Sequence, residues 1–314
     1  MALVTSPKSP LVAQLRGFHL FHFDGAPCAQ RVRFALGEKE LVRGKEVPWE
    51  SIDPATLDAA RGTWTSRHVS LIKKQHLSDA YAAIQPNMVV PALVHDGKLY
   101  IESLDIIRYV DALWPASTLF PSVPTASALN EELLREGDAL HVSVRYVSFR
   151  WGLGKLGKLN QKHEQTLARL EDPSSPEAMA SFYQRFDRNG ISEAIYCSHL
   201  AALTRGYAKL EHILRRDGEA FLCGDSLSAA DILWSLKVLR IHECGYPFAE
   251  MFPTLYTWFE RVRGRPAFKQ GVMGKHRMMS SAFRIKAALE HLFGRGIRQT
   301  ECWRSEEFRQ IDSI

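Results

Sequence analysis

The chain has 314 residues, of which 46% are hydrophobic and 24% charged, with a formal net charge of +5. These proportions are those of an ordinary globular protein long enough for two domains. No uninterrupted apolar run approaches the roughly 20 residues of a membrane-spanning helix. Residues 1–10 also lack the apolar core of a signal peptide. We therefore expect a cytoplasmic protein whose partners include neither a membrane nor a nucleic acid.

The cysteines and histidines lack the spacing of metal ligands. The five cysteines are Cys28, Cys197, Cys223, Cys244 and Cys302, and the chain contains neither C-x-x-C nor H-E-x-x-H. An odd number of widely separated cysteines predicts no disulfide framework, and the absence of both motifs predicts no metal site.

Residues 17–116 have the mixed strand and helix pattern of an α/β domain, and we expect residues 1–16 to be a flexible leader. Gly17–Phe23 is a short β-rich run, and Ala26–Leu36 follows it. A second strand is expected near Gly44–Trp49.

A long stretch, Ser51–Gln85, separates this second strand from the next strong signal. Such a length is unusual for a connection inside a compact domain. Helical patterns at Pro54–Ala60 and Val69–Ala83 predict an enlarged, partly helical cover over a ligand site.

Residues 85–110 predict a hairpin followed by a helix. Ala92–Val94 and Leu99–Ile101 are short apolar runs on either side of Asp96-Gly97. This dipeptide favours a tight hairpin turn because both residues tolerate positive φ. Pro91 has no N–H to donate to a sheet, so it belongs at the start of a strand.

The two ends of this unit are candidate ligand-binding groups. Val90, beside Pro91, would offer free main-chain groups to an extended peptide. Ser103 precedes an apolar helical stripe and is the expected N-cap, where open N–H groups favour a carboxylate. Glu102 is available to a ligand ammonium. The alternative, an ordinary hairpin and capped helix, leaves the positions of Pro91 and Glu102 unexplained.

The rest of the chain is predicted to be helical. Residues 117–125 are rich in proline and small residues and form the linker to a helical domain, residues 126–272. Ser228–Asp231 predicts a variant capping box at the start of an apolar helix. Residues 273–314 form a basic extension in which residues 275–300 carry six Lys or Arg and one Glu. This pattern is typical of a solvated amphipathic helix or of a surface for an acidic partner.

Four stretches together, spanning about residues 17–270, resemble cytosolic glutathione transferases. They are the strand and helix around Ala26-Pro27-Cys28, the run from Val90-Pro91 to Glu102-Ser103, Gly224–Asp231, and Arg263–Phe268. The resemblance implies an α/β, thioredoxin-like N-terminal domain followed by an all-α, helical-bundle C-terminal domain. It also implies a homodimer or heterodimer, with glutathione as the cosubstrate. Val90, Pro91, Glu102 and Ser103 would bind the glutathione.

The sequence departs from this family where the sulfur of glutathione is bound. Ala26 stands where a Ser or Cys usually serves the sulfur, and alanine has no hydrogen to donate. Three alternatives are open: Cys28 acts as a catalytic thiol, main-chain N–H groups of residues 25–28 stabilise the thiolate, or the chain is a non-catalytic subunit. A second departure is Met88, where the family commonly has glycine, and it implies a differently shaped approach to the ligand.

A narrower resemblance concerns the helical domain. Arg145–Lys158, followed by residues 188–190, resembles bacterial β-aryl etherases, which are glutathione transferases that cleave the β-O-4 ether of lignin fragments. It implies that an aromatic substrate contacts Arg145, Tyr146 and Trp151. Glutathione would attack the carbon that bears the aryloxy group. The alternatives are a non-catalytic binding protein on the same fold and a thiol transferase that depends on Cys28.

Overall fold

A six-stranded mixed sheet forms the centre of the N-terminal part of the computed structural model, which describes residues 3–150, 159–168, 182, 186, 190–305 and 308. The strands are β1 (Leu3–Val4), β2 (Phe18–His22), β3 (Val42–Pro48), β4 (Thr63–His68), β5 (Ala92–His95) and β6 (Lys98–Tyr100). Their order is β1-β6-β5-β2-β4-β3. The pairs β2–β4 and β3–β4 are parallel, and the other pairs are antiparallel.

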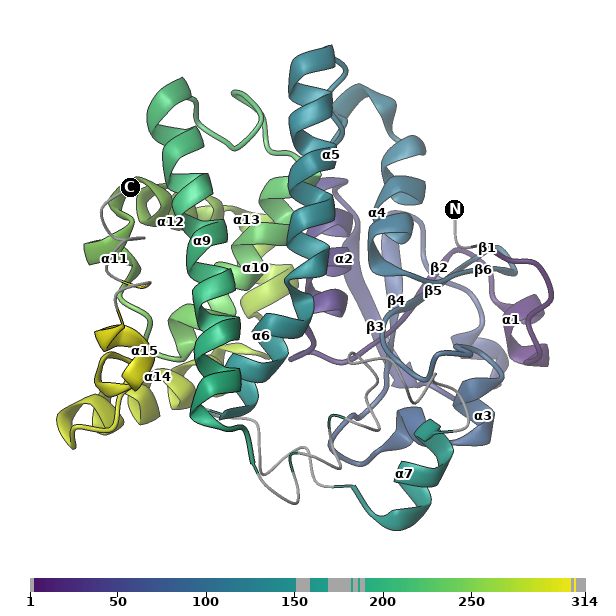
Figure 1. Ribbon diagram of the computed structural model, residues 1–314. Coiled ribbons are helices and arrows are strands. Elements are labelled where there is room, and N and C mark those ends of the chain that lie inside the picture. Colours follow the sequence, from purple (N-terminus) through teal and green to yellow (C-terminus); the bar gives the residue numbers. More distant parts are fainter. Residues whose placement is uncertain are drawn as a thin grey trace. The chain divides into compact units, whose positions relative to one another are not determined.

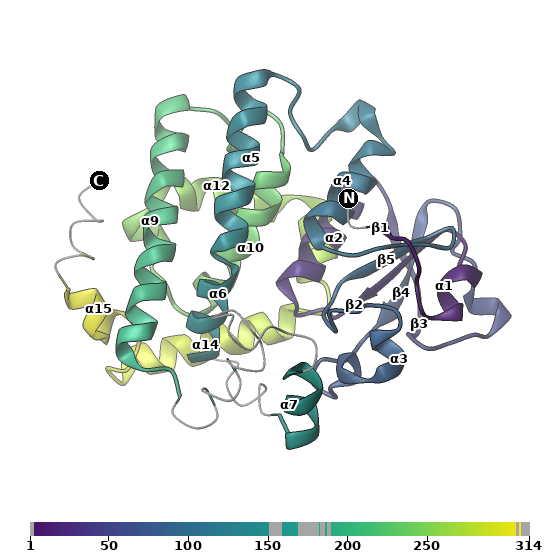
Figure 2. The same cartoon turned by 45° about the vertical axis from the view of Figure 1, so that its right-hand side comes forward.

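Helices lie on both sides of this sheet (Figures 1 and 2). They are α1 (Pro10–Gln14), α2 (Pro27–Glu38), α3 (Asp79–Ala82) and α4 (Ser103–Ala112), with 3₁₀ turns η1 (Pro54–Thr56), η2 (Gln75–Leu77) and η3 (Pro115–Ser117). α2 and α4 pack together on one side, and α1 and α3 lie on the other. This arrangement is thioredoxin-like and confirms the predicted fold class of the N-terminal part.

Residues 3–16 are not a flexible leader, contrary to the prediction from sequence. β1 pairs with β6 at one edge of the sheet. α1 buries Leu11 and Val12 in the hydrophobic core of the sheet, and Leu15, just after the helix, lies in the same core. The three apolar side chains therefore hold this segment against the domain, where the hydrophobic effect favours them.

Strand β4 was missed from the sequence because it is built largely from polar residues that are buried. Arg67 is inaccessible to solvent, and its guanidinium donates to three main-chain carbonyls and to His19. Such a polar strand carries no alternating apolar pattern. The helices expected at Pro54–Ala60 and Val69–Ala83 are correspondingly reduced to η1, η2 and the single turn α3.

The chain forms two compact units, residues 1–118 with 265–276 and residues 119–264 with 277–314. This differs from the expected domains, in which residues 126–272 were one helical domain. Residues 265–276 instead group with the sheet.

Close contacts explain this grouping of residues 265–276. α13 (Pro266–Phe268) and the π-helical turn η6 (Lys269–Met273) pack against α2. Arg265 donates to both oxygens of the Glu38 carboxylate, at 2.7 and 2.6 Å. A Cβ at Gly37 would lie 2.9 Å from the Cβ of Ala267, so the approach of the two segments requires glycine.

The second unit is helical. Its elements are α5 (Pro124–Ala139), α6 (His141–Ser148), α7 (Gln161–Ala168), α9 (Glu193–Asp217), α10 (Ala229–Glu243), α11 (Phe248–Met251), α12 (Pro253–Gly264), α14 (Arg277–Leu292), the 3₁₀ turn η7 (Ile297–Gln299) and α15 (Glu301–Arg304). α5, α9 and α10 lie side by side (Figures 1 and 2). α10 contacts α5, α6, α12 and α14, and nearly all of its residues are buried. The predicted helical domain is thus a bundle around α10.

A buried carboxylate fixes the start of α10. The predicted capping box is confirmed: Ser228 Oγ accepts from the Asp231 N–H, and the Asp231 carboxylate accepts from the Ser228 N–H at 2.8 Å. Asp231 also accepts from the Leu222 N–H at 2.9 Å and from the indole of Trp258 at 2.7 Å. One side chain therefore joins α10, α12 and the loop before α10.

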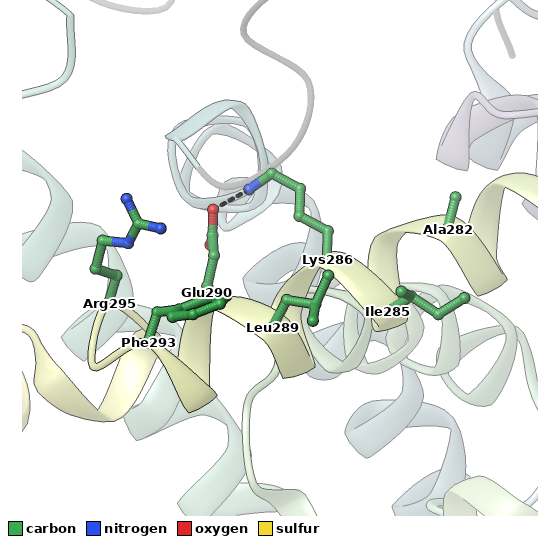
Figure 3. A pocket seen from close by; sticks show the side chains of 7 residues that line it. All are labelled: Ala282, Ile285, Lys286, Leu289, Glu290, Phe293 and Arg295. Atoms are coloured by element: carbon green, nitrogen blue, oxygen red, sulfur yellow. Dashed lines mark hydrogen bonds and ion pairs between the residues drawn. The ribbon is translucent and has the colours of Figure 1, made fainter.

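Helix α14 confirms that residues 275–300 are mainly helical, but its outer face is more apolar than a solvated helix requires. Met278, Ile285 and Leu292 are 84%, 61% and 76% exposed. Figure 3 shows a shallow pocket on this helix, lined by Ala282, Ile285, Lys286, Leu289, Glu290, Phe293 and Arg295. Lys286 and Glu290 form an ion pair at its edge. Across the described residues, no helix is long and apolar enough to cross a membrane.

The burial of His19 predicts that the protein loses stability in mild acid. Desolvation, with the nearby charge of Arg67, lowers the pKa of His19 from 6.5 to about 4. The neutral ring accepts from Arg67 and bonds to the Arg16 carbonyl. The unfolded chain binds this proton more readily, so stability is full above pH ~6.5 and falls as the pH decreases toward ~4.

We expect His19→Gln to lower the slope of unfolding free energy against pH by up to ~1.4 kcal/mol per pH unit between pH 6 and 5, as measured by urea denaturation. His212→Gln, on an exposed part of α9, is the matched control and should leave the slope unchanged. Equal slopes for His19→Gln and the parent protein would contradict the assignment.

Candidate functional site

The cis peptide bond Val90–Pro91 directly precedes the hairpin β5–β6. Asp96 and Gly97 have φ values of 49° and 77°, which confirms the predicted tight turn. β5 begins at Ala92, directly after the proline. Among the described residues, neither main-chain group of Val90 has a hydrogen-bond partner. Both groups could therefore pair with a ligand, although the Val90 residue as a whole is buried.

Helix α4 begins at Ser103, one residue earlier than predicted. Glu102, not Ser103, is the N-cap residue, and it makes no capping hydrogen bond with its side chain. The first main-chain bond of the helix runs from the Ile106 N–H to the Glu102 carbonyl, so the preceding N–H groups are unused by the helix. Within the described chain the Ser103 hydroxyl has no partner either. This helix start is suited to an anion.

Asn87 connects the two halves of the predicted site. Its amide donates to Glu102 Oε1 at 3.1 Å, so the loop before Val90 contacts the start of α4. The Asn87 N–H in turn donates to Gln85 Oε1 at 2.7 Å. Tyr81 supports the same loop by donating its hydroxyl to the Val89 carbonyl at 2.8 Å. The sequence reasoning missed both Asn87 and Tyr81, because neither lies in a hairpin or capping pattern.

Two residues of this site have backbone conformations that favour glycine. Glu102 has φ 60° and ψ 113°, and Met88 has φ 51°. For residues with a Cβ such conformations cost about 1–3 kcal/mol each and are concentrated at functional sites. Met88 thus keeps a glycine-like backbone although it replaces the usual glycine, and its side chain is buried.

At the start of α2 the structure brings Cys28 and Arg31 together. Ala26 is the N-cap residue, and no side chain caps the helix. Arg31 donates to Cys28 Sγ at 3.2 Å, and Cys28 is half-buried. A guanidinium and a helix N-terminus are both surroundings in which thiols ionise more readily. The sequence reasoning did not identify Arg31.

Fewer main-chain N–H groups are free to stabilise a thiolate at this helix start than the sequence suggested. The Ala26 N–H donates to the Phe23 carbonyl at 3.2 Å, and Pro27 has no N–H. The first intrahelical bond is from the Gln30 N–H to the Ala26 carbonyl. The N–H of Ala29 has no partner within the described residues, so it remains a candidate donor.

A network of charges holds the loop between β2 and α2. Arg33 is buried and donates to the carbonyls of Phe23 and Asp24 at 3.2 and 2.8 Å. Arg43 pairs with the Asp24 carboxylate at 2.7 Å. Burial alone would raise the pKa of Asp24, but the hydrogen bond with Arg43 and the charges of Arg33 and Arg43 outweigh it and lower that pKa. Asp24 is therefore an anion with a structural role.

The predicted substrate-binding residues lie in the second unit. Tyr146, on α6, is buried, stacks on His199 at 4.2 Å and meets Phe182 edge-on at 5.0 Å. The guanidinium of Arg145 lies 5.7 Å from the Phe182 ring centroid. Trp151 lies outside the described residues. Arg145 and Tyr146 thus belong to an aromatic cluster, and their contact with a substrate stays a prediction.

The chain thus combines a thioredoxin-like unit, which carries this candidate site, with a helical bundle. Sequence models of the family match both parts. The glutathione S-transferase N-terminal domain matches residues 20–118, and the glutathione S-transferase C-terminal domain matches residues 174–266. The chain belongs to the glutathione S-transferase family, whose members use glutathione as cosubstrate.

Individual relatives are distant. Glutathione S-transferase L1 of Arabidopsis thaliana is 39% identical over 67 residues, which are 21% of this chain and only 28% of that protein. Protein LigF of Sphingobium sp. (strain NBRC 103272 / SYK-6) is 26% identical over 205 residues, covering 63% of this chain and 78% of LigF. The crystal structure of the β-etherase LigF from strain SYK-6 superposes with a TM-score of 0.63 and 22% identity, covering 81% of this chain and 98% of that one.

The strained backbone of Glu102 predicts that a glycine variant at this position is more stable than an alanine variant. Glycine is usually less stable than alanine inside regular structure, by about 0.5–1 kcal/mol. At φ 60° we expect the reverse, with Glu102→Gly more stable than Glu102→Ala by about 1 kcal/mol. Both variants lose the carboxylate and its bond to Asn87, so their difference isolates the backbone. Urea denaturation of the two variants measures it, and a less stable Glu102→Gly would disprove the strain.

Proposed function

We propose that this chain binds glutathione at the site formed by Val90, Pro91, Glu102 and Ser103. The main chain of the glutathione cysteine pairs with Val90. The γ-glutamyl carboxylate lies at the start of α4 and accepts from the Ser103 hydroxyl, while Glu102 pairs with the ammonium. The observation that carries the proposal is the Asn87–Glu102 hydrogen bond, because it brings the strand edge and the helix start within reach of one small ligand.

We propose further that the chain catalyses attack of the glutathione thiol on an aromatic ether. The sulfur forms a bond to the carbon that bears the aryloxy group, the carbon–oxygen bond breaks, and the leaving aryloxide takes a proton to give a phenol. The likeness to LigF, a β-etherase of Sphingobium, supports this substrate class. Arg145, Tyr146 and Trp151 would contact the aromatic substrate. We also expect a cytoplasmic dimer, which sedimentation analysis would test.

A second candidate activity follows from the contact between Arg31 and Cys28. With Ala26 at the usual position of the activating side chain, the Cys28 thiol is the side chain at this helix start that can itself react. A thiol transferase would use Cys28 to attack a glutathione mixed disulfide, forming a Cys28–glutathione disulfide and releasing the reduced thiol of the substrate. A third possibility is a non-catalytic subunit that binds glutathione alone.

Titration calorimetry with glutathione tests the binding site. We expect Ser103→Ala and Glu102→Ala each to weaken binding about tenfold, because each removes a hydrogen bond to a charged group of the ligand. Ser122→Ala, at an exposed serine of the second unit, should bind like the parent protein. Unchanged affinity in both site variants would rule out this site.

The missing hydroxyl at Ala26 allows a gain-of-function test of the chemistry. Ala26→Ser restores a donor to the thiolate, and we expect kcat/KM for glutathione-dependent cleavage of a β-aryl ether to rise at least about tenfold at neutral pH. Ala26→Gly changes the same position without a hydroxyl and should show no increase. Release of the phenol gives the readout, with the chain alone and with candidate partner subunits.

Cys28→Ala separates the remaining alternatives. Ether cleavage that persists in this variant excludes Cys28 as the catalytic thiol. Reduction of a glutathione mixed disulfide that disappears in the variant supports the thiol transferase. Glutathione binding without either activity, including in Ala26→Ser, identifies the non-catalytic subunit.

A further inference from the structure

The start of α9 and the short helix α15 bring two cysteines and a glutamate together. Glu193 and Cys197 are four residues apart on α9, so they share one face of the helix. Cys302 belongs to α15, which packs against α9. One ligand atom from each of these three residues lies within 4.8 Å of the others. The sequence reasoning predicted no metal site, because Cys302 is remote along the chain and no C-x-x-C motif marks it.

The carboxylate of this cluster is held in place by other groups. Arg150 forms an ion pair with Glu193 Oε2 and also donates to the Ile191 carbonyl at 3.0 Å. Glu193 Oε1 accepts from the Glu301 N–H, the first residue of α15, at 3.2 Å. Carboxylates that ligate metals are commonly oriented by such outer hydrogen bonds.

The two thiols of this cluster are shielded from solvent to different degrees. Cys302 is 3% exposed and Cys197 is half-buried. A bound metal cation deprotonates its thiol ligands outright.

We propose that Glu193, Cys197 and Cys302 bind a thiophilic divalent cation, with Zn²⁺ as the physiological candidate and water as the fourth ligand. Zinc–sulfur bonds of about 2.3 Å place two sulfurs of a tetrahedral site about 3.8 Å apart, which small side-chain rotations reach from the present separation. Two thiolates and a carboxylate carry three negative charges. The cation neutralises two of them, and Arg150 lies beside the third. The site would fasten α15 to α9.

Cobalt(II) titration of the full-length chain under a non-thiol reductant tests the site. We expect one equivalent of Co²⁺ to give sulfur-to-cobalt charge-transfer absorption and the intense visible bands of tetrahedral coordination, with Zn²⁺ displacing the cobalt. Binding should acidify a weakly buffered solution as the Cys197 thiol proton is released, and should raise the unfolding temperature.

Variants locate the metal. Cys197→Ser should abolish the charge-transfer band, and Glu193→Gln should weaken Co²⁺ binding by at least about tenfold. Cys302→Ser should behave like Cys197→Ser, and circular dichroism verifies its folding because Cys302 is buried. Cys223→Ser, at a buried cysteine elsewhere in the same unit, is the matched control and should keep the band.

Two results would overturn the proposal. One is a cobalt spectrum without sulfur ligation, or one that Cys197→Ser leaves unchanged. The other is failure to bind metal combined with conversion of Cys197 and Cys302 to a disulfide by oxidised glutathione, detected by peptide mass spectrometry. That second result would identify a redox pair instead.

Discussion

The buried guanidinium of Arg33 is the interaction on which the N-terminal unit depends. It donates to the carbonyls of Phe23 and Asp24 and to the Gly271 carbonyl at 2.7 Å. Burial lowers the pKa of Arg33 to about 10, which still leaves it charged at neutral pH. A buried charge is tolerated only when its donors are satisfied. Arg33 therefore fixes the loop that delivers Ala26 and also ties in residues 265–276, which are distant in sequence.

Local signals could be read from the sequence because a few adjacent residues determine each of them. The Asp96-Gly97 turn, the capping box at Ser228–Asp231 and the existence of a helix in residues 104–110 depend on backbone preferences and neighbouring hydrogen bonds. β4 could not be predicted, because Arg67 is buried only where carbonyls from other segments accept its hydrogens. The packing of α1 has the same explanation: its apolar side chains need a surface that only the folded sheet provides.

In the candidate site, too, the sequence predicted some residues and missed others. Val90, Pro91, Glu102 and Ser103 lie in one continuous stretch, so their types and spacing pointed to a ligand. The exact start of α4 did not follow, since Glu102 adopts a strained backbone that a propensity argument would assign to glycine. Asn87 and Arg31 were missed because each acts through a side-chain contact that depends on the fold.

The groups that would bind a thiol ligand lie at the start of α4, whereas those that would ionise its sulfur lie at the start of α2. At α4 the Ser103 hydroxyl, which has no partner among the described residues, and the unused N–H groups would bind the charged end of a tripeptide. At α2 the corresponding position is Ala26, the neighbouring Pro27 has no N–H, and the Ala26 N–H is already donated to Phe23. Beside this helix start Arg31 donates to the Cys28 thiol. In the proposed site, binding would draw on several independent groups, whereas ionisation of the sulfur would depend on one guanidinium and the helix terminus. Substitutions near α2 should therefore change rate far more than affinity.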